Sequence, residues 1–204
     1  METPETAPDR HGRREAIRVG GLRSRAIDAA LAMVEAGGPE GASLRELARA
    51  LGTGPASLYH HFANKDALMA ELAVEGFRRL AGAFEAAFRE PLGRTALHAG
   101  GDAYLSFART HPRLYRLMHA ESLLAGHQIV RDAEAAAFRA FAVGISEGGA
   151  SGDVLEDRAM ALWAFGRGLA GITLATGDGL SPPARELARQ MVRGLESLMG
   201  RSIR

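Results

Sequence analysis

The chain has 204 residues, of which 47% are hydrophobic and 24% are charged, and its formal net charge is +1. This composition is typical of a globular protein with a buried core, and the near-neutral total excludes a polycation that binds nucleic acid through overall charge. The absence of cysteine excludes disulfides, thiolate zinc sites, iron–sulfur clusters and cysteine nucleophiles.

The first twenty residues mix proline, glycine, arginine and acid without helical periodicity, which predicts a flexible basic arm over residues 1–20. Six arginines against one acid, Glu15, fall between Arg10 and Arg25. A solvated tail and an arm that contacts DNA phosphates both fit this surplus, and a DNA-binding unit after it favours the second. No signal-peptide core or membrane-length apolar run occurs, so we expect a cytoplasmic protein that does not enter membranes.

A first helix is predicted from Leu22 to Val34, where apolar residues recur at intervals of three and four. The Gly-Gly-Pro sequence at 37–39 ends it. Ser43 suits the N-cap position of a short second helix, and Glu46, three residues on, completes a capping box.

The second helix is broken by Gly-Thr-Gly at 52–54, and Pro55 suits the first turn of a third helix that runs to Phe62. Asn64 then caps a longer fourth helix. Two short helices joined by a glycine-bearing turn after a supporting helix predict a helix-turn-helix DNA-binding domain over residues 21–67.

The rest of the chain, residues 68–204, has helical apolar patterns and no sustained alternation with β-branched residues, so no strand is expected. We therefore predict an all-α fold of about nine helices, a three-helix DNA-binding head followed by a helical effector-binding and dimerisation domain. Beyond Pro91 the predicted helices cover residues 95–110, 112–120, 122–147, 153–176 and 183–199.

Residues 24–72 resemble the TetR/AcrR family of bacterial transcriptional regulators. The resemblance is carried by SLRELARALGTGPASLYHHFANKDALMAEL at 43–72, and most of all by LYHHFANKDAL at 58–68. Further on, Trp163 and the pair Arg167-Gly168 resemble the Trp-His-Gly type of C-terminal domain in this family, with Arg167 in place of the histidine.

The resemblance implies a DNA-reading unit around the turn and the third helix. Small residues at 54–57 allow the backbone to approach the major groove, which is about 12 Å wide. Few side chains here can make bidentate contacts with bases, so specificity relies on van der Waals contact, water and DNA shape. Arg45 could also be plain surface, and His61 could pack against the first helix. The implied DNA-contacting residues are Arg45, Thr53, Gly54, Pro55, Ser57, Tyr59, His60, His61 and Lys65.

A homodimer on a palindromic double-stranded operator doubles the contacts of one helix-turn-helix. The last two predicted helices are the candidate dimer surface, although their apolar residues could instead face the core of their own protomer. These residues are Leu162, Phe165, Leu169, Ile172 and Leu174 on one helix and Leu187, Met191, Leu195 and Leu198 on the other.

The resemblance also implies a small-molecule pocket in the C-terminal domain, and apolar liners favour a hydrophobic effector. Each candidate could equally be plain core. The candidate lining residues are Tyr104, Phe107, Met118, His119, Phe138, Phe141, Trp163 and Arg167.

An enzyme is not expected. Three histidines at 111, 119 and 127 lie near Glu121, but they straddle a predicted helix break, and no HExxH, phosphate-binding loop or nucleophile elbow occurs. We therefore expect no catalytic residue, metal or cofactor. The predicted function is a ligand-responsive DNA-binding regulator, a repressor by the usual mode of the family; the alternative is an interaction module that uses the helix-turn-helix without an effector.

Overall fold

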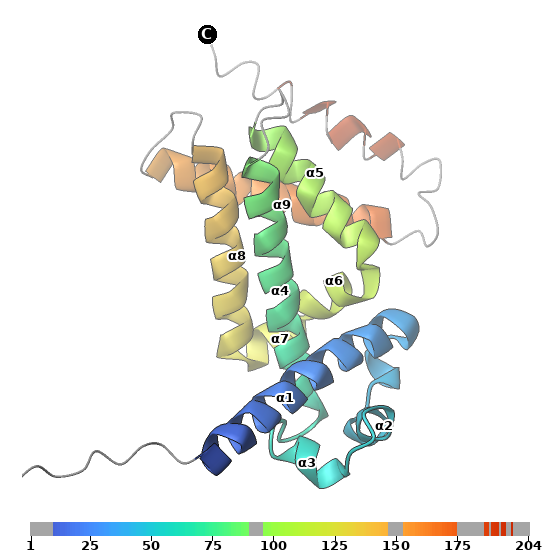
Figure 1. Cartoon of the computed structure of the whole chain (residues 1–204). Coiled ribbons are helices and arrows are strands. Elements are labelled where there is room, and N and C mark those ends of the chain that lie inside the picture. Colours follow the sequence, from blue (N-terminus) through green and yellow to red (C-terminus); the bar gives the residue numbers. More distant parts are fainter. Residues whose placement is uncertain are drawn as a thin grey trace, which may run out of the picture. The chain divides into compact units, whose positions relative to one another are not determined.

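The computed structural model describes residues 10–89, 96–146 and 153–174 and, further on, positions 186, 187, 189–191, 193, 194 and 197. These residues form helices and no strand, which confirms the predicted all-α class (Figure 1). The helices are α1 (Arg10–Gly37), the 3-10 helix η1 (Pro39–Gly41), α2 (Leu44–Ala50), α3 (Pro55–Tyr59), α4 (Lys65–Arg89), α5 (Ala96–Thr110), α6 (Pro112–Met118), α7 (Glu121–Gly126), α8 (Gln128–Ser146) and α9 (Asp153–Leu174).

The chain divides into two compact units between Leu72 and Ala73, inside α4. The first unit holds α1, η1, α2, α3 and the start of α4, and the second unit holds the rest of α4 and α5 to α9. The boundary expected at residue 67 lies in the first turn of the same helix. None of the described helices combines the length and the apolar character needed to cross a membrane.

α1 is longer at its start than the sequence pattern predicted. It begins at Arg10 rather than near Leu22, so the backbone of residues 10–20, expected to be a flexible arm, is helical. Arginine, glutamate and alanine favour helices, which explains a helix without an apolar period. Residues 1–9 of the expected arm lie outside the described residues. At its other end α1 stops where predicted, and Gly38 follows it with a φ of 83°.

Both predicted N-caps are formed in the first unit. The Ser43 hydroxyl oxygen accepts from the main-chain N–H of Glu46 at 3.2 Å, and it donates to the Glu46 carboxylate at 2.8 Å. Asn64 Oδ1 accepts from the main-chain N–H of Ala67 at 2.8 Å. These caps satisfy orphan donors at the starts of α2 and α4, which fixes where each helix begins.

The turn between α2 and α3 is a Schellman motif centred on Gly52. The N–H of Gly52 donates to the carbonyl of Arg49 at 3.2 Å, and the N–H of Thr53 donates to the carbonyl of Ala48 at 3.0 Å. Gly52 has a φ of 63°, a left-handed conformation that side chains with a Cβ rarely adopt. Glycine at this position therefore sets the angle at which the chain enters α3.

The core of the first unit is apolar and joins all of its helices. The buried residues recur along α1, α2 and α4 at the predicted spacing, and α1 packs against α2 and η1 while α2 packs against α3. They include Ala26, Ala30, Leu31, Val34, Leu44, Leu47, Ala48, Leu58, Phe62, Leu68, Met69 and Leu72.

The second unit is built around α5, which packs against α6, α8 and α9. α6 begins at Pro112, as the His-Pro break predicted, because proline fits the first turn of a helix. The predicted helix over 122–147 is divided at His127 into α7 and α8. For the predicted helix at 183–199, the described positions are helical and the others lie outside the described residues.

Candidate nucleic-acid interface

α3 is anchored by two side chains and leaves others accessible. Leu58 and Phe62 are buried, whereas the Tyr59 side chain is 49% exposed. Ser57 lies half-buried on the same helix. Residues on one side of α3 thus hold it in the core, and a hydroxyl and a phenol remain on the accessible side.

The predicted DNA-contacting residues all lie in the first unit, on α2, α3, the turns that follow each of them and the start of α4, and none of them is buried. Their positions on packed helices give them a rigid support, as a DNA-reading surface needs. Arg45, Gly54, Pro55, Tyr59, His60 and Lys65 are exposed, and Thr53, Ser57 and His61 are half-buried.

His60 and His61 do not lie within α3, as the predicted helix to Phe62 implied. α3 ends at Tyr59, and the histidines form the turn that follows. Helix-type bonds persist, because the N–H of Phe62 still donates to the carbonyl of Leu58 at 2.9 Å. The ring of His61 meets the ring of Phe62 edge-on at 6.2 Å, so His61 packs partly on the core.

Lys65 occupies the predicted position in the first turn of α4 but already has a partner. Its ammonium group donates to the main-chain carbonyl of Glu40 at 3.2 Å, which joins α4 to η1. The lysine is exposed, and an ammonium group has three donors, so this bond leaves capacity for a phosphate.

The positive charge next to α3 comes from α2 and α4 rather than from α3, which has no charged residue. Arg45 and Arg49 are both exposed and lie one turn apart on α2. Arg49 was not among the predicted DNA contacts, although its four-residue interval from Arg45 places it on the same helix face. Arg45, Arg49 and Lys65 can meet phosphates, while Ser57 and Tyr59 can donate to phosphates or base edges.

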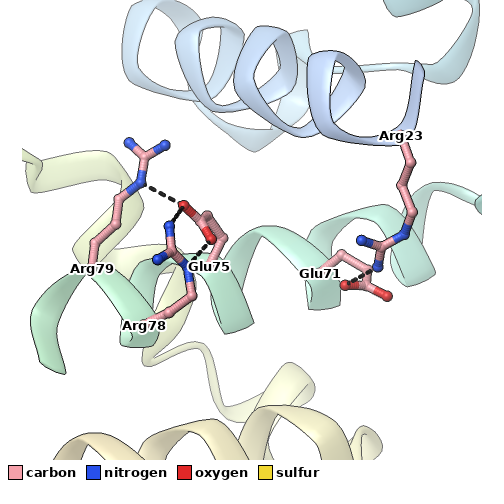
Figure 2. A network of polar contacts seen from close by, with 5 residues as sticks. All are labelled: Arg23, Glu71, Glu75, Arg78 and Arg79. Atoms are coloured by element: carbon pink, nitrogen blue, oxygen red, sulfur yellow. Dashed lines mark hydrogen bonds and ion pairs between the residues drawn. The ribbon is translucent and has the colours of Figure 1, made fainter. Parts of the chain in front are cut away.

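Arg23 on α1 is paired inside the first unit, since its guanidinium lies 2.7 Å from the Glu71 carboxylate (Figure 2). Within the second unit, Glu75 accepts from Arg78 and Arg79 (Figure 2). These bonds lower the pKa of Glu75, the hydrogen bond from Arg78 most strongly. Arg23 is therefore already engaged by a carboxylate in the folded head.

The candidate effector residues lie in the second unit, and four of them form one aromatic cluster. The ring of Trp163 lies 5.4 Å from Tyr104, 5.7 Å from Phe138 and 6.0 Å from Phe141. Phe84, which the sequence analysis did not single out as a candidate, also contacts Trp163 at 6.0 Å. Phe84 is buried on α4, and helical spacing alone does not show which helix it meets.

A line of polar groups runs beside this cluster. The hydroxyls of Tyr104 and Tyr115 lie 3.2 Å apart, and Tyr115 donates to the main-chain carbonyl of Arg167 at 3.5 Å. The Arg167 guanidinium pairs with Glu134 at 3.0 Å. Burial raises the pKa of both tyrosines, so their hydroxyls stay protonated donors. Tyr115 and Glu134 were missed as candidates, because neither follows a recognisable spacing from the others.

His119 is the most unusual polar group in this unit. Its Nδ1 lies 3.0 Å from the main-chain carbonyl of Tyr115 and therefore donates to it, and its ring meets Phe77 edge-on at 5.3 Å. Its Nε2 is buried and, among the described residues, has no hydrogen-bond partner. Burial lowers the pKa of His119 to about 4, so the ring is neutral and Nε2 is an unused acceptor.

The remaining candidates, Phe107 and Met118, have other neighbours. Phe107 packs its ring against His111 at 5.2 Å. Met118 is buried against Gly76, where an added Cβ would lie 2.5 Å from the methionine sulfur. Among the described residues, histidines and carboxylates do not gather in a group of three that could hold a metal ion.

Two segments of the chain match models of known protein families, and both families are of the same kind. Residues 26–72 match the family of bacterial regulatory proteins called the tetR family, and residues 97–195 match the C-terminal domain described as tetracyclin repressor-like. The chain belongs to the TetR family. The TetR family consists of transcriptional regulators rather than enzymes, and the predicted helix-turn-helix head with a helical C-terminal domain is confirmed.

Relatives of this TetR-family chain include an uncharacterized helix-turn-helix regulator, YobS, of Bacillus subtilis strain 168. It is 33% identical over 98 residues, which are 48% of this chain and 51% of YobS, so the match spans about half of either protein. A transcriptional regulator of Rhodococcus sp. Rha1 shares 25% identity, with a TM-score of 0.61 over 86% of this chain and 96% of that one. The TetR-family regulator PfmR of Thermus thermophilus has 19% identity and a TM-score of 0.53 over 83% and 97%, which indicates a common fold.

Proposed function

We propose that this TetR-family regulator is a repressor that binds a palindromic operator as a homodimer and is released from it by a small hydrophobic effector. It acts in the cytoplasm, where bacterial DNA lies. The observation that carries the DNA-binding part is the arrangement of α3, in which buried Leu58 and Phe62 fix the helix while Tyr59 and Ser57 remain accessible.

The DNA-reading surface consists of Arg45, Thr53, Gly54, Pro55, Ser57, Tyr59, His60, His61 and Lys65. The small residues at the start of α3 let its backbone approach the floor of the major groove. Tyr59 donates to a phosphate or a base edge, and the cations on α2 and α4 meet phosphates on either side of the groove. The head at residues 21–67 reads DNA, and residues 68–204 bind the effector and the second protomer.

Dimerisation is supported by exposed apolar side chains on two neighbouring helices. Ile129 and Val143 on α8 are 46% and 67% exposed, and Met160 on α9 is 51% exposed. α8 and α9 pack against each other, so these residues belong to one pair of helices. Leu169, expected at the dimer surface, is buried in its own protomer, whereas Gly168 beside it is exposed. The proposed dimer surface therefore includes α8 and the face of α9 that carries Gly168. On the last predicted helix Leu187 is also 45% exposed, so that helix remains a candidate, and Leu195 and Leu198 lie outside the described residues.

An apolar effector is supported by the ring cluster around Trp163 and by the unused acceptor on His119. Aromatic and thioether side chains bind an apolar body, and a single acceptor such as Nε2 selects a compound with one hydrogen-bond donor. Effector binding in the C-terminal domain weakens operator binding if the compound prefers the conformation in which the two heads are spaced wrongly.

The test of DNA binding is the substitution Tyr59→Ala, with Tyr59→Phe as the matched variant. The operator is first selected from random duplexes by the wild-type protein, and the selected sequence should be an inverted repeat. Tyr59→Ala is expected to weaken operator binding at least about tenfold, since a hydrogen bond to a charged group contributes about 1.5–3 kcal/mol.

Tyr59→Phe keeps the ring and removes the hydroxyl, so the difference between the two variants separates stacking from hydrogen bonding. Gel shifts measure the affinity, and circular dichroism checks that both variants are folded. Unchanged affinity in a folded Tyr59→Ala protein would show that α3 is not the DNA-reading helix.

A further inference from the structure

The exposed side of α8 carries a stripe of three apolar side chains. Ile129, Ala136 and Val143 recur at intervals of seven residues, which places them within an arc of about 40° along one side of the helix. All three are exposed, and Val143, at 67%, is the most exposed large apolar side chain in the described part of the chain. The buried residues of α8 lie between about 80° and 140° further around the helix, so the stripe faces away from the core of its own protomer.

Two opposite charges lie on one flank of this stripe. Asp132 and Arg139 are exposed, are also seven residues apart, and stand about 50° from the line of the stripe on the flank away from the core. Gln128 donates to the Asp132 carboxylate at 2.8 Å, and in the described part of the chain Arg139 pairs with no carboxylate. On the flank nearer the core the corresponding residues are the half-buried Ala133 and Ala140. Charges therefore border the stripe on one side only.

The order of these charges decides which pairing of two α8 helices is favourable. In a parallel pair related by a twofold axis each residue meets its own copy, so Asp132 would meet the partner's Asp132 and like charges would repel. In an antiparallel pair centred on Ala136, residues about equally far from the centre on either side lie opposite each other. Ile129 then meets the partner's Val143, and Asp132 meets the partner's Arg139. The antiparallel pair thus joins apolar to apolar and acid to base at both ends.

We propose that α8 packs against α8 of a second copy of this chain in the antiparallel orientation centred on Ala136, and that the contacts between Asp132 and the partner's Arg139 make this surface select an identical chain. This inference rests on the proposed homodimer. The small side chain at the centre lets the two backbones approach closely, and the stripe extends over about 21 Å of helix. A related regulator with another order of charges would bring like charges together or leave a charge unpaired, so the same surface rejects it.

The apolar stripe and the charges contribute differently to this pairing. Burial of the apolar side chains provides most of the affinity, because an ion pair at the edge of an interface is weak. The charges provide selectivity, since like charges placed together disfavour a wrong partner. A twofold dimer contains each contact twice, so reversing one charge in the chain replaces two attractions by two repulsions. Selectivity between partners is therefore larger than one exposed ion pair would give.

The test begins with two charge reversals on the full chain, Asp132→Arg and Arg139→Glu, which keep residues that favour a helix. Each variant alone should raise the dimer Kd by about tenfold or more at low salt. The increase should shrink at high salt, where exposed charges are screened. Sedimentation velocity over a range of protein concentrations measures the Kd, and circular dichroism checks that the variants are folded.

Mixing the variants tests the pairing itself. The D132R protein has a basic residue at both positions and the R139E protein has an acid at both, so an equimolar mixture should form mixed dimers with about the affinity of the wild type. Native mass spectrometry distinguishes mixed dimers from homodimers by the masses of their subunits. The double variant D132R/R139E inverts the order of the charges, so it should pair with itself and not with the wild type.

The matched control is Arg109→Glu, the same reversal at an exposed arginine of α5, which should leave the dimer Kd unchanged. The inference is overturned if the single variants dimerise like the wild type, if their mixture forms no mixed dimers, or if the double variant pairs as readily with the wild type as with itself. A monomeric wild type would overturn the proposed homodimer as well, whereas a wild-type dimer that ignores these charges would overturn only the pairing of α8 proposed above.

Discussion

At the scale of single residues, His119 is a base that the fold keeps neutral. Its Nδ1–H is used by the Tyr115 carbonyl, and its Nε2 is buried without a partner among the described residues. Protonation would place a charge on Nε2 next to the rings of Phe77 and Tyr115, where little solvent can stabilise it. Burial accordingly lowers the pKa of His119 to about 4, against 6.5 in the unfolded chain.

The lowered pKa predicts that His119 makes the free energy of unfolding depend on pH. Because the unfolded chain binds this proton more readily, the contribution is fully present above pH 6.5 and is lost as the pH falls toward about 4. The shift corresponds to roughly 3 kcal/mol at most. Urea denaturation of the wild type and of His119→Asn from pH 7 to pH 4 measures it, since asparagine keeps the donor to Tyr115 and cannot be protonated.

The variant His60→Asn is the control, because His60 is exposed in the turn after α3. It should retain the pH dependence of the wild type, whereas His119→Asn should flatten it. Equal slopes for all three proteins would mean that His119 is accessible to solvent in the folded state.

At the scale of helices, α8 carries an apolar stripe on its accessible side. Ile129, Ala136 and Val143 recur at intervals of seven residues, and Ile129 and Val143 at its two ends are exposed. Residues at this interval share one side of a helix and can meet the same stripe of a twofold partner. The stripe makes α8 the main helix of the proposed dimer surface.

A charge in the middle of this stripe is predicted to separate the protomers. Ala136→Glu places a carboxylate where the partner helix packs, and burying it unpaired should raise the dimer dissociation constant about 100-fold or more. Sedimentation velocity measures the shift toward monomer. Operator affinity should fall with it, because a single head makes half the contacts.

The matched control is Ala86→Glu, which makes the same change at an exposed alanine of α4. It should leave the sedimentation coefficient and the operator affinity unchanged. Dissociation by both variants would indicate general destabilisation rather than a dimer surface on α8.

Helix boundaries could be predicted where a side chain caps a helix or a glycine or proline ends one. Ser43, Asn64 and Pro112 begin the helices that the sequence assigned to them. The start of α1 could not be predicted, because no apolar period marks residues 10–20 and only helix propensity favours their conformation. The end of α3 was also displaced, to Tyr59, since helix-type bonds continue into the turn that follows.

The residues of the candidate sites also divide into those that the sequence could predict and those that it could not. The sequence motif around Tyr59 predicted which positions of the head are accessible. This was possible because the spacing of apolar residues within a few helical turns shows which side chains are buried and which are not. The partners of Trp163 could not be predicted, since Tyr104, Phe138 and Phe141 come from two other helices and helical spacing does not specify which faces meet. The bond from Lys65 to the Glu40 carbonyl has no sequence signal, because any residue supplies a carbonyl.

At the scale of the whole molecule, α4 takes part in both compact units, since the division falls between Leu72 and Ala73. Its first turns carry Lys65 and the cap by Asn64, and its later turns carry Phe84, which contacts Trp163. Coupling between an effector and an operator requires that each ligand prefers one of two states of the molecule. The helix common to both units is the element through which such a preference is transmitted in the proposed mechanism.

The single tryptophan of the chain offers a direct measure of that coupling. A hydrophobic compound with one donor group should change the emission of Trp163, raise the melting temperature and weaken operator binding. By linkage, binding of the operator should weaken the affinity of the protein for the compound by the same factor. Titrations of a panel of such compounds, with and without operator, check both directions.

The variant Phe138→Leu should reduce the affinity for the compound, because this ring lies against Trp163. Phe165→Leu, two positions beyond Trp163 and on another side of α9, is the matched control. If no compound in a chemically broad panel alters emission, melting or operator affinity, the regulator works without an effector.

Lys65 is the only lysine in the sequence, and it lies on the proposed DNA-reading surface. Apart from the amino terminus, every amine-directed reaction on this protein therefore converges on the first turn of α4. A fluorophore coupled to lysine amines labels the head at one internal position, and acetylation there removes a cation from the surface that faces the operator. In a protein whose other basic residues are arginines, acylation of lysine acts on the contact with DNA and leaves the remaining positive charges unchanged.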